Sequence, residues 1–155
     1  MSRLSFLVCS VLSIAAVAPA QLAGTYTIGP GGSFADMTAA IAALTTSGVV
    51  APVNFLVIAN QTGPWTIGPI PGQGPANPVV FNTLGTITLS GTQPVLTLNG
   101  CASVTFQGFS GTFTTTSSAV VVAGTTADCT FRNINFSRSE EHTSELQSQF
   151  RISYA

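Results

Sequence analysis

An approximate internal repeat of 24 to 25 residues limits the folds open to this chain more than any other feature. The segment VLTLNGCASVTFQGF (residues 95–109) aligns with VVVAGTTADCTFRNI (residues 120–134) after a slip of one residue. The matched positions are Leu98 with Val122, Gly100 with Gly124, and residues 104–106 with residues 129–131. A unit of two short strands around a glycine turn cannot bury its own apolar face, so neighbouring units must share a core. The repeat therefore predicts the stacked turns of a solenoid.

Residues 52–137 consist of short apolar or alternating runs separated by Gly, Pro, Asn and Ser. The runs are rich in β-branched residues, which favour strands. ITLSG (residues 87–91) resembles LTLNG (residues 96–100) and is interpreted as another copy of the repeat. Short strands at regular spacing also occur in antiparallel sandwiches, so an all-β class follows in either case. The predicted strands are 26–28, 53–58, 65–67, 79–81, 87–89, 95–98, 104–106, 120–122 and 129–136.

One helix, over residues of about 33–46, is predicted near the start. Ser33 stands before an apolar run and Asp36 follows three residues later, a pattern that caps helix N-termini through the hydroxyl and the carboxylate. The opposite face carries Ala and Thr rather than charge, so this helix is expected to pack on another element. The apolar positions that fall on one helical face are Phe34, Met37, Ile41 and Leu44.

Residues 1–20 have the layout of a secretory signal peptide. Arg3 precedes an apolar run over residues 4–17, and Ala18-Pro19-Ala20 supplies a small-residue cleavage pattern before Gln21. A membrane anchor is the alternative, but the run is shorter than the roughly 20 residues that a spanning helix needs. We therefore expect a secreted or cell-surface protein with no membrane span after cleavage.

Five segments of the mature chain resemble the N-terminal region of secreted right-handed parallel β-helix proteins of the pectate-lyase-like superfamily. The resemblance covers roughly residues 24–137. It implies a parallel β-helix domain over residues 21–137, with the opening helix as the cap of the cylinder. It also implies a polysaccharide or cell-surface glycan as the partner. The segments are GTYTIGPGGSFADMTAAIAAL, PVNFLVIANQTGPWTI, NPVVFNTLGTITLSG, PVLTLNGCASVTFQGF and CTFRNINFS.

The charge content is low. Charged residues make up 6% of the chain, against about 25% in typical soluble domains. The sequence contains no lysine, and nucleic-acid binding needs clustered cations, so a nucleic-acid partner is not expected.

Few side chains of the mature segment are suited to catalysis. Asp36 and Asp128 are the only carboxylates in residues 21–137, whereas glycoside hydrolysis usually needs two flanking the bond. Asp36 is assigned to the helix cap, and Asp128 precedes a strand, where a turn-stabilising carboxylate is common. We therefore predict no catalytic residue, no cofactor and no metal ion in this segment.

Three residues are weak candidates for ligand binding. Trp65 lies in a segment rich in Pro and Gly and is the best candidate among the aromatic residues for an exposed platform that binds a sugar ring. Asp128 and Arg132 are close enough in sequence to form an ion pair, which contributes little when exposed. Phe106 and Phe131 recur at one position of the repeat, which indicates core packing rather than ligand stacking.

Cys101 and Cys129 are the only cysteines after the predicted cleavage site. They are interpreted either as a possible disulfide or as two small buried side chains. Two cysteines with no histidine between them are too few ligands for a zinc site.

The composition changes abruptly at Arg138. Residues 138–155 hold all three Glu and the only histidine, His142, but no strand alternation. As protein the tail reads as a short helix or a disordered end. It also resembles the translation of a common short-read sequencing adapter, in which RSEEHTSELQS and ISYA are the constant parts. If this hypothesis holds, the biological chain is truncated near Ser137.

Two functions remain from the sequence. The first is a secreted or cell-surface β-helix that is carbohydrate-binding, or adhesive and structural, with no catalytic site in this segment. The alternative is the N-terminal part of a polysaccharide lyase or glycoside hydrolase whose catalytic turns lie beyond Ser137.

Overall fold

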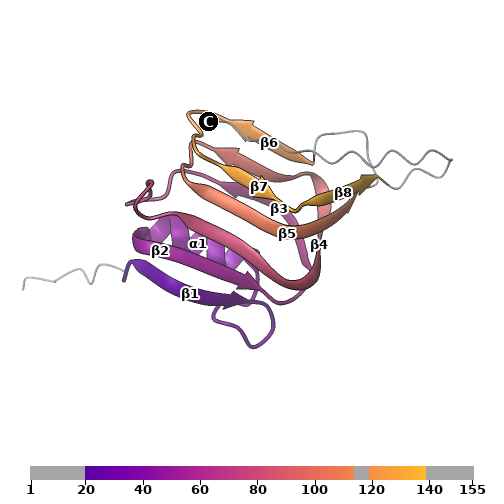
Figure 1. Cartoon of the computed structure of the whole chain (residues 1–155), viewed down its shortest axis with the longest axis horizontal. Coiled ribbons are helices and arrows are strands. Elements are labelled where there is room, and N and C mark those ends of the chain that lie inside the picture. The colour runs from indigo at the N-terminus through magenta and orange to yellow at the C-terminus, as the bar shows by residue number, and fades with distance from the viewer. Residues whose placement is uncertain (1–19, 114–118, 139–155) are drawn as a thin grey trace, which may run out of the picture.

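The structure is a computed structural model, and it describes residues 20–113 and 119–138. It contains eight strands and one helix in the described residues, stacked from β1 at one end to β7 at the other (Figure 1). The elements are β1 (Leu22–Ile28), α1 (Met37–Ser47), β2 (Val49–Val57), β3 (Gln61–Ile67), β4 (Val79–Asn99), β5 (Val104–Phe113), β6 (Val120–Ala123), β7 (Thr130–Arg132) and β8 (Asn135–Arg138).

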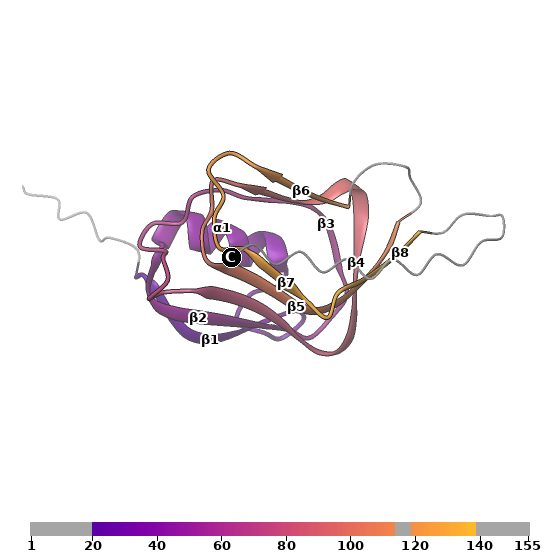
Figure 2. The ribbon, with the colours of Figure 1, turned by 45° about the horizontal axis from the view of Figure 1, so that its top comes forward.

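The strands form a parallel β-solenoid of about four turns. Its cross-section has three sides, which are visible in the tilted view (Figure 2). The first side pairs β1, β2, the start of β4, β5 and β7 in that order. On the second side, the start of β3 pairs with the middle of β4, the middle of β4 pairs with the end of β5, and the end of β5 pairs with β8. On the third side, the end of β3 pairs with the end of β4, which in turn pairs with β6. All of these ladders are parallel, which excludes the antiparallel sandwich.

The predicted repeat corresponds to the register of successive turns. Leu98 pairs with Val122, and Phe106 pairs with Phe131, as in the sequence alignment. The comparison of ITLSG with LTLNG was wrong, because residues 87–91 and 96–99 are consecutive sides of one turn and both belong to β4. The two segments look alike because every side of the solenoid alternates inward and outward residues in the same way.

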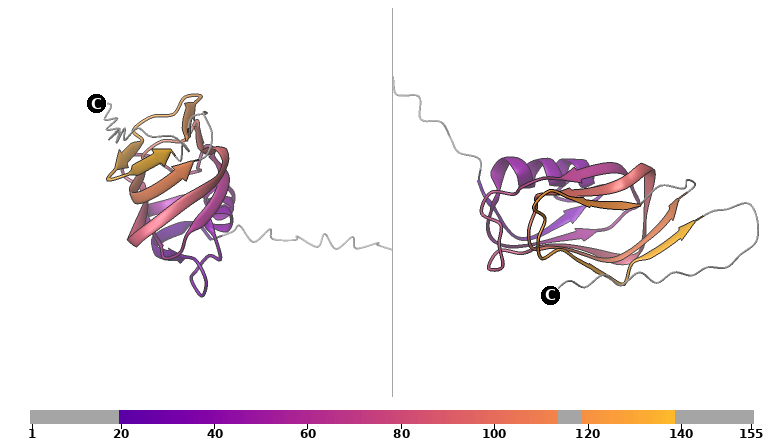
Figure 3. Two further views of the ribbon diagram at one scale, coloured as in Figure 1. Left: turned by 90° about the vertical axis from the view of Figure 1, so that its right-hand side faces the viewer. Right: turned by 90° about the horizontal axis from the view of Figure 1, so that it is seen from above.

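Helix α1 takes the place that strands occupy in later turns, and it packs against β1 and β3 (Figure 3). It buries Met37, Ala40, Ile41 and Leu44 in the core. The helix begins later than predicted, because its N-cap is Asp36, whose Oδ1 accepts from the backbone N–H of Ala39 at 2.8 Å. The prediction of Ser33 as a cap was wrong: its Oγ accepts from the backbone N–H of Thr27 in β1 at 3.3 Å.

Stacked phenylalanines run through the core beneath the first side. The ring centroids of Phe55 and Phe81 are 5.0 Å apart, those of Phe81 and Phe106 are 4.8 Å apart, and those of Phe106 and Phe131 are 5.7 Å apart. The predicted core role of Phe106 and Phe131 is thereby confirmed. Parallel in-register strands lie one spacing of about 4.8 Å apart, so identical side chains stack when they recur once per turn.

Two predicted segments fall outside this description. The signal peptide (residues 1–20) and the adapter-like tail (residues 138–155) lie outside the described residues, apart from Ala20 and Arg138. No helix among the described residues is long and apolar enough to cross a membrane.

Candidate functional site

A groove of about 330 Å³ lies where the start of α1 meets the start of β3. It includes exposed hydroxyl, amide and carboxylate groups together with one aromatic ring. A volume of this size falls at the lower end of known ligand sites, which run from roughly 300 to 1,000 Å³. The residues lining it are Pro30, Ala35, Asp36, Thr38, Ala59, Asn60, Gln61, Thr62 and Trp65.

Gln61 holds the two walls of the groove together. Its Oε1 accepts from the backbone N–H of Met37 at 2.9 Å, and its Nε2 donates to the carbonyl of Ala59 at 3.0 Å. The side chain is only 5% exposed. Gln61 thus satisfies one of the orphan N–H groups of the first helical turn from a strand 24 residues away in the chain. This bond fixes where α1 sits on the second turn.

Asp36 and Thr38 supply the helix side of the groove. Asp36 has one oxygen engaged in the cap, and its side chain is exposed. Thr38 is exposed on the first turn of α1. This wall therefore presents a carboxylate and a hydroxyl as hydrogen-bonding groups.

Asn60 and Thr62 supply the strand side, and both are exposed. The Oδ1 of Asn60 accepts from the backbone N–H of Thr88 in the next turn at 2.9 Å. The Thr62 and Ser90 hydroxyls lie 3.2 Å apart across the same pair of turns. The contacts orient both side chains. The Asn60 amide N–H groups have no partner among the described residues, so they are available to a ligand.

Trp65 lines the groove, but it is not the exposed platform for which the sequence made it a candidate. Its side chain is 5% exposed and belongs to the core cluster. Trp65 has the same strand parity as the buried Gln61 and Ile67, so the alternation of β3 turns it inward. A Cβ built on Gly63 would lie 3.0 Å from the Trp65 ring, so this ring also packs closely on the backbone.

Asp128 and Arg132 lie far along the stack from Trp65. Asp128 occupies the corner before β7 with a φ of 52°, and Arg132 ends β7. Both are exposed, and no ion pair between them is present in the part of the chain that the structure describes. Arg132 instead continues an outward row on the first side, through the pairings of Leu56 with Asn82, Asn82 with Gln107, and Gln107 with Arg132. The structure therefore separates the three predicted ligand residues into two places.

The two carboxylates that the sequence offered for hydrolysis are also separated. Asp36 lies beside the first and second turns, whereas Asp128 precedes the last described strand pair. Several strand spacings of about 4.8 Å lie between them, whereas glycosidase carboxylates stand about 5 to 10 Å apart. Within residues 20–113 and 119–138, no group of three or more His, Cys, Asp or Glu side chains is placed to hold a metal ion.

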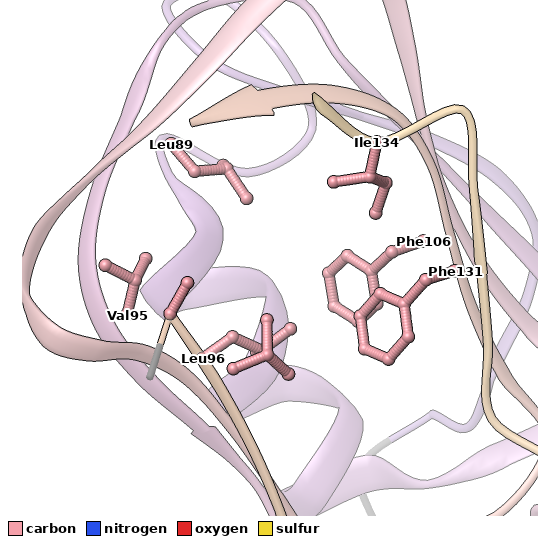
Figure 4. A pocket seen from close by; sticks show the side chains of 8 residues that line it. Leu89, Val95, Leu96, Phe106, Phe131 and Ile134 are labelled. Atoms are coloured by element: carbon pink, nitrogen blue, oxygen red, sulfur yellow. The ribbon is translucent and has the colours of Figure 1, made fainter. Parts of the chain in front are cut away.

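A second hollow of about 10 Å³ lies inside the solenoid and is lined by apolar side chains. Figure 4 shows Phe106 and Phe131 on one side of it and Leu89, Val95 and Leu96 on the other. An enclosed water needs at least roughly 10 to 15 Å³ and two or more polar partners, which this lining does not provide. The hollow is therefore a gap in core packing rather than a ligand site.

Cys101 and Cys129 are free thiols in this structure. The sequence left open a disulfide or two small buried side chains, and the structure places the two Sγ atoms 4.0 Å apart. Cys101 is fully buried and Cys129 is half-buried.

Sequence reasoning missed most of the groove. Thr38, Asn60, Gln61 and Thr62 carry no local motif, and residues 61–64 were not predicted to form a strand. One signal was present: Trp65 and Ile67 alternate with Thr66, which places the tryptophan on the buried side.

Comparisons of the chain with protein-family models, with curated proteins and with solved structures find no match. The resemblance to the pectate-lyase-like superfamily and the adapter hypothesis therefore stay predictions. The assignment of the fold rests on the parallel ladders alone.

Proposed function

We propose that this protein is an exported carbohydrate-binding β-solenoid and that the groove beside α1 holds the glycan. The observation that carries the proposal is the gathering of Asp36, Thr38, Asn60 and Thr62 around one groove with Trp65 at its wall. The Asp36 carboxylate accepts hydrogen bonds from sugar hydroxyls, the Asn60 amide N–H groups donate to them, and the threonine hydroxyls do both. Few polar groups fixed in a partly apolar hollow are typical of small-ligand sites.

The charges of the groove favour a neutral glycan over an acidic one. Asp36 is the only charged residue in the lining, and no cation is part of it. An anionic polysaccharide would meet the Asp36 carboxylate with no positive partner, and like charges at close range are unfavourable. The neutral glycan proposed here therefore differs from the acidic polysaccharide that the name of the pectate-lyase-like superfamily suggests.

The test compares two arginine substitutions on one helix. Thr38→Arg fills the groove, whereas Thr46→Arg places the same side chain in the last turn of α1, about 12 Å further along the helix axis. Both threonines are exposed, so both variants are expected to fold. Binding is measured by affinity electrophoresis in gels that contain neutral polysaccharides, with an acidic polysaccharide in a parallel gel.

We expect the wild-type chain and Thr46→Arg to be retarded by at least one neutral polysaccharide. Thr38→Arg should lose at least ten-fold in affinity. The proposal is wrong if no polysaccharide retards the wild type, or if Thr38→Arg binds as well as Thr46→Arg does.

A further inference from the structure

The two mature cysteines occupy neighbouring corners of the solenoid. Cys101 follows β4 and Cys129 precedes β7, so each stands just before a strand of the first side. The Sγ atoms are 4.0 Å apart. The chain between them makes one complete turn through β5 and β6.

Backbone hydrogen bonds hold these corners against each other. Ala102 and Ala127 form a parallel bridge. The N–H of Ser103 donates to the carbonyl of Ala127 at 3.1 Å, and the N–H of Ala127 donates to the carbonyl of Cys101 at 3.1 Å. Cys101 directly precedes Ala102, and Cys129 stands two residues after Ala127, so both thiols flank this hydrogen-bonded corner. A disulfide has an S–S length of about 2.05 Å, so closure must bring the sulfurs roughly 2 Å nearer than their separation of 4.0 Å.

We propose that Cys101 and Cys129 are a redox-active pair that closes into a disulfide by exchange with a low-molecular-weight disulfide such as oxidised glutathione. The Cys129 thiolate attacks one glutathione sulfur, the glutathione S–S bond breaks, and one glutathione thiolate leaves. Cys101 then gives its proton to solvent and attacks the Cys129 sulfur, which releases the second glutathione thiolate. Two electrons pass from the protein sulfurs to the glutathione disulfide, which is reduced to two thiols.

Exposure assigns the order of attack. Cys129 is half-buried and reachable by a small disulfide, whereas Cys101 is 0% exposed. The thiol hydrogen bond from Cys101 lowers the pKa of Cys129 to about 7, against the opposing effects of burial and of the neighbouring Asp128. The same hydrogen bond and burial raise the pKa of Cys101. Cys129 is thus the attacking sulfur and Cys101 the resolving one.

Closure would convert one whole turn of the solenoid into a covalent ring. The ring ties the corner before β5 to the corner before β7, which is the last described strand of the first side. A cross-link over a loop of this length restricts the unfolded chain and thereby stabilises the folded one.

The experiment equilibrates the full chain with oxidised or reduced glutathione, alkylates the free thiols and digests with chymotrypsin. Phe106 and Phe109 lie between the two cysteines, so the cleaved peptides separate them unless a disulfide joins them. Mass spectrometry also distinguishes a linkage that involves Cys9. We expect the Cys101 and Cys129 peptides to be joined, and the melting temperature to rise by roughly 10 °C on oxidation.

Serine variants test which cysteine attacks first and whether the disulfide causes the rise in melting temperature. Cys101→Ser should accumulate a mixed disulfide with glutathione at Cys129, whereas Cys129→Ser should react several-fold more slowly. The double variant should lose the redox dependence of melting. The proposal is overturned if Cys101 and Cys129 both stay alkylatable in oxidised glutathione, if a linkage to Cys9 replaces theirs, or if only a mixed disulfide forms on the wild type.

Discussion

The rings of Phe81 and Phe106 stack with their centroids 4.8 Å apart and their planes at 9°, although the two residues belong to different turns. Both side chains are essentially fully buried. Phe55 and Phe131 extend the stack on either side. This column joins four successive levels of the first side through side chains as well as through backbone ladders. Removal of one ring therefore weakens the packing of the turns above and below it.

We predict that Phe81→Ala lowers the free energy of unfolding by about 3 to 5 kcal/mol, because it leaves a cavity between two flanking rings. Urea unfolding followed by circular dichroism measures the change. Leu84→Ala is the control, since Leu84 is 69% exposed and its truncation should shift stability by less than about 0.5 kcal/mol. Equal effects of the two substitutions would contradict the role of the column.

Gly72 and Gly85 both have left-handed backbones, with φ of 78° and 88°, but differ in their surroundings. A Cβ on Gly72 would collide with the carbonyl oxygen of Val49, whereas a Cβ on Gly85 would meet nothing within 4 Å. Gly85→Ala should thus cost only the left-handed penalty of about 1 to 2 kcal/mol. Gly72→Ala should cost more, because the backbone must also shift. Thermal unfolding of the pair measures this, and an equal loss would argue against the close approach.

The fold could be predicted from the sequence because parallel stacking repeats residue types once per turn. The sequence repeat aligned Phe106 with Phe131 and Leu98 with Val122, and the structure pairs the same residues on neighbouring strands. The sequence could not show which similar segments lie on successive turns and which lie on two sides of the same turn. Residues 87–91 and 96–99 obey the same inward and outward alternation, so they look like a repeat while forming one bent strand.

The candidate site was less predictable than the fold, because contacts between residues far apart in the sequence form the groove. The bond between Gln61 and the N–H of Met37 joins a strand to a helix across 24 residues, and no local pattern encodes it. Trp65 was misplaced because the glycine and proline around it suggested a loop, whereas β3 runs through them as a strand. Asp36 was found because a helix cap depends on neighbouring residues only.

Gln61 should be the polar residue whose loss is most costly. Gln61→Leu removes both of its hydrogen bonds and leaves the N–H of Met37 without this acceptor. An unsatisfied group of this kind costs about 1 to 3 kcal/mol. Gln107→Leu on the outward row of the first side is the matched control and should change stability by less than about 0.5 kcal/mol. Urea unfolding of the two variants decides the matter, and a neutral Gln61→Leu would show that α1 is held by apolar packing alone.

Asp36 separates capping from charge. Asp36→Ala removes the acceptor for the N–H of Ala39 and should cost about 1 kcal/mol. Asp36→Asn keeps a good cap and should stay within about 0.5 kcal/mol of the wild type. The thermal unfolding of the two variants gives the comparison. If Asp36→Asn destabilises as much as Asp36→Ala does, the carboxylate charge matters more than the cap.

Alkylation should reveal the different acidities of the two thiols. The hydrogen bond from Cys101 lowers the pKa of Cys129 to about 7, so the Cys129 thiolate forms at a lower pH than in an unperturbed cysteine. The iodoacetamide rate at Cys129 should therefore rise with pH through a midpoint near 7 and level off above it. Cys101 has a raised pKa and a buried sulfur, so it should stay slow across the same range. Peptide mass spectrometry of the reduced chain follows both sites at once. In Cys101→Ala the hydrogen-bond donor is removed, and the midpoint should move upward toward the usual thiol value of about 8.5. A Cys129 midpoint that already lies there in the wild type would mean that the thiol pair does not share a hydrogen bond in solution.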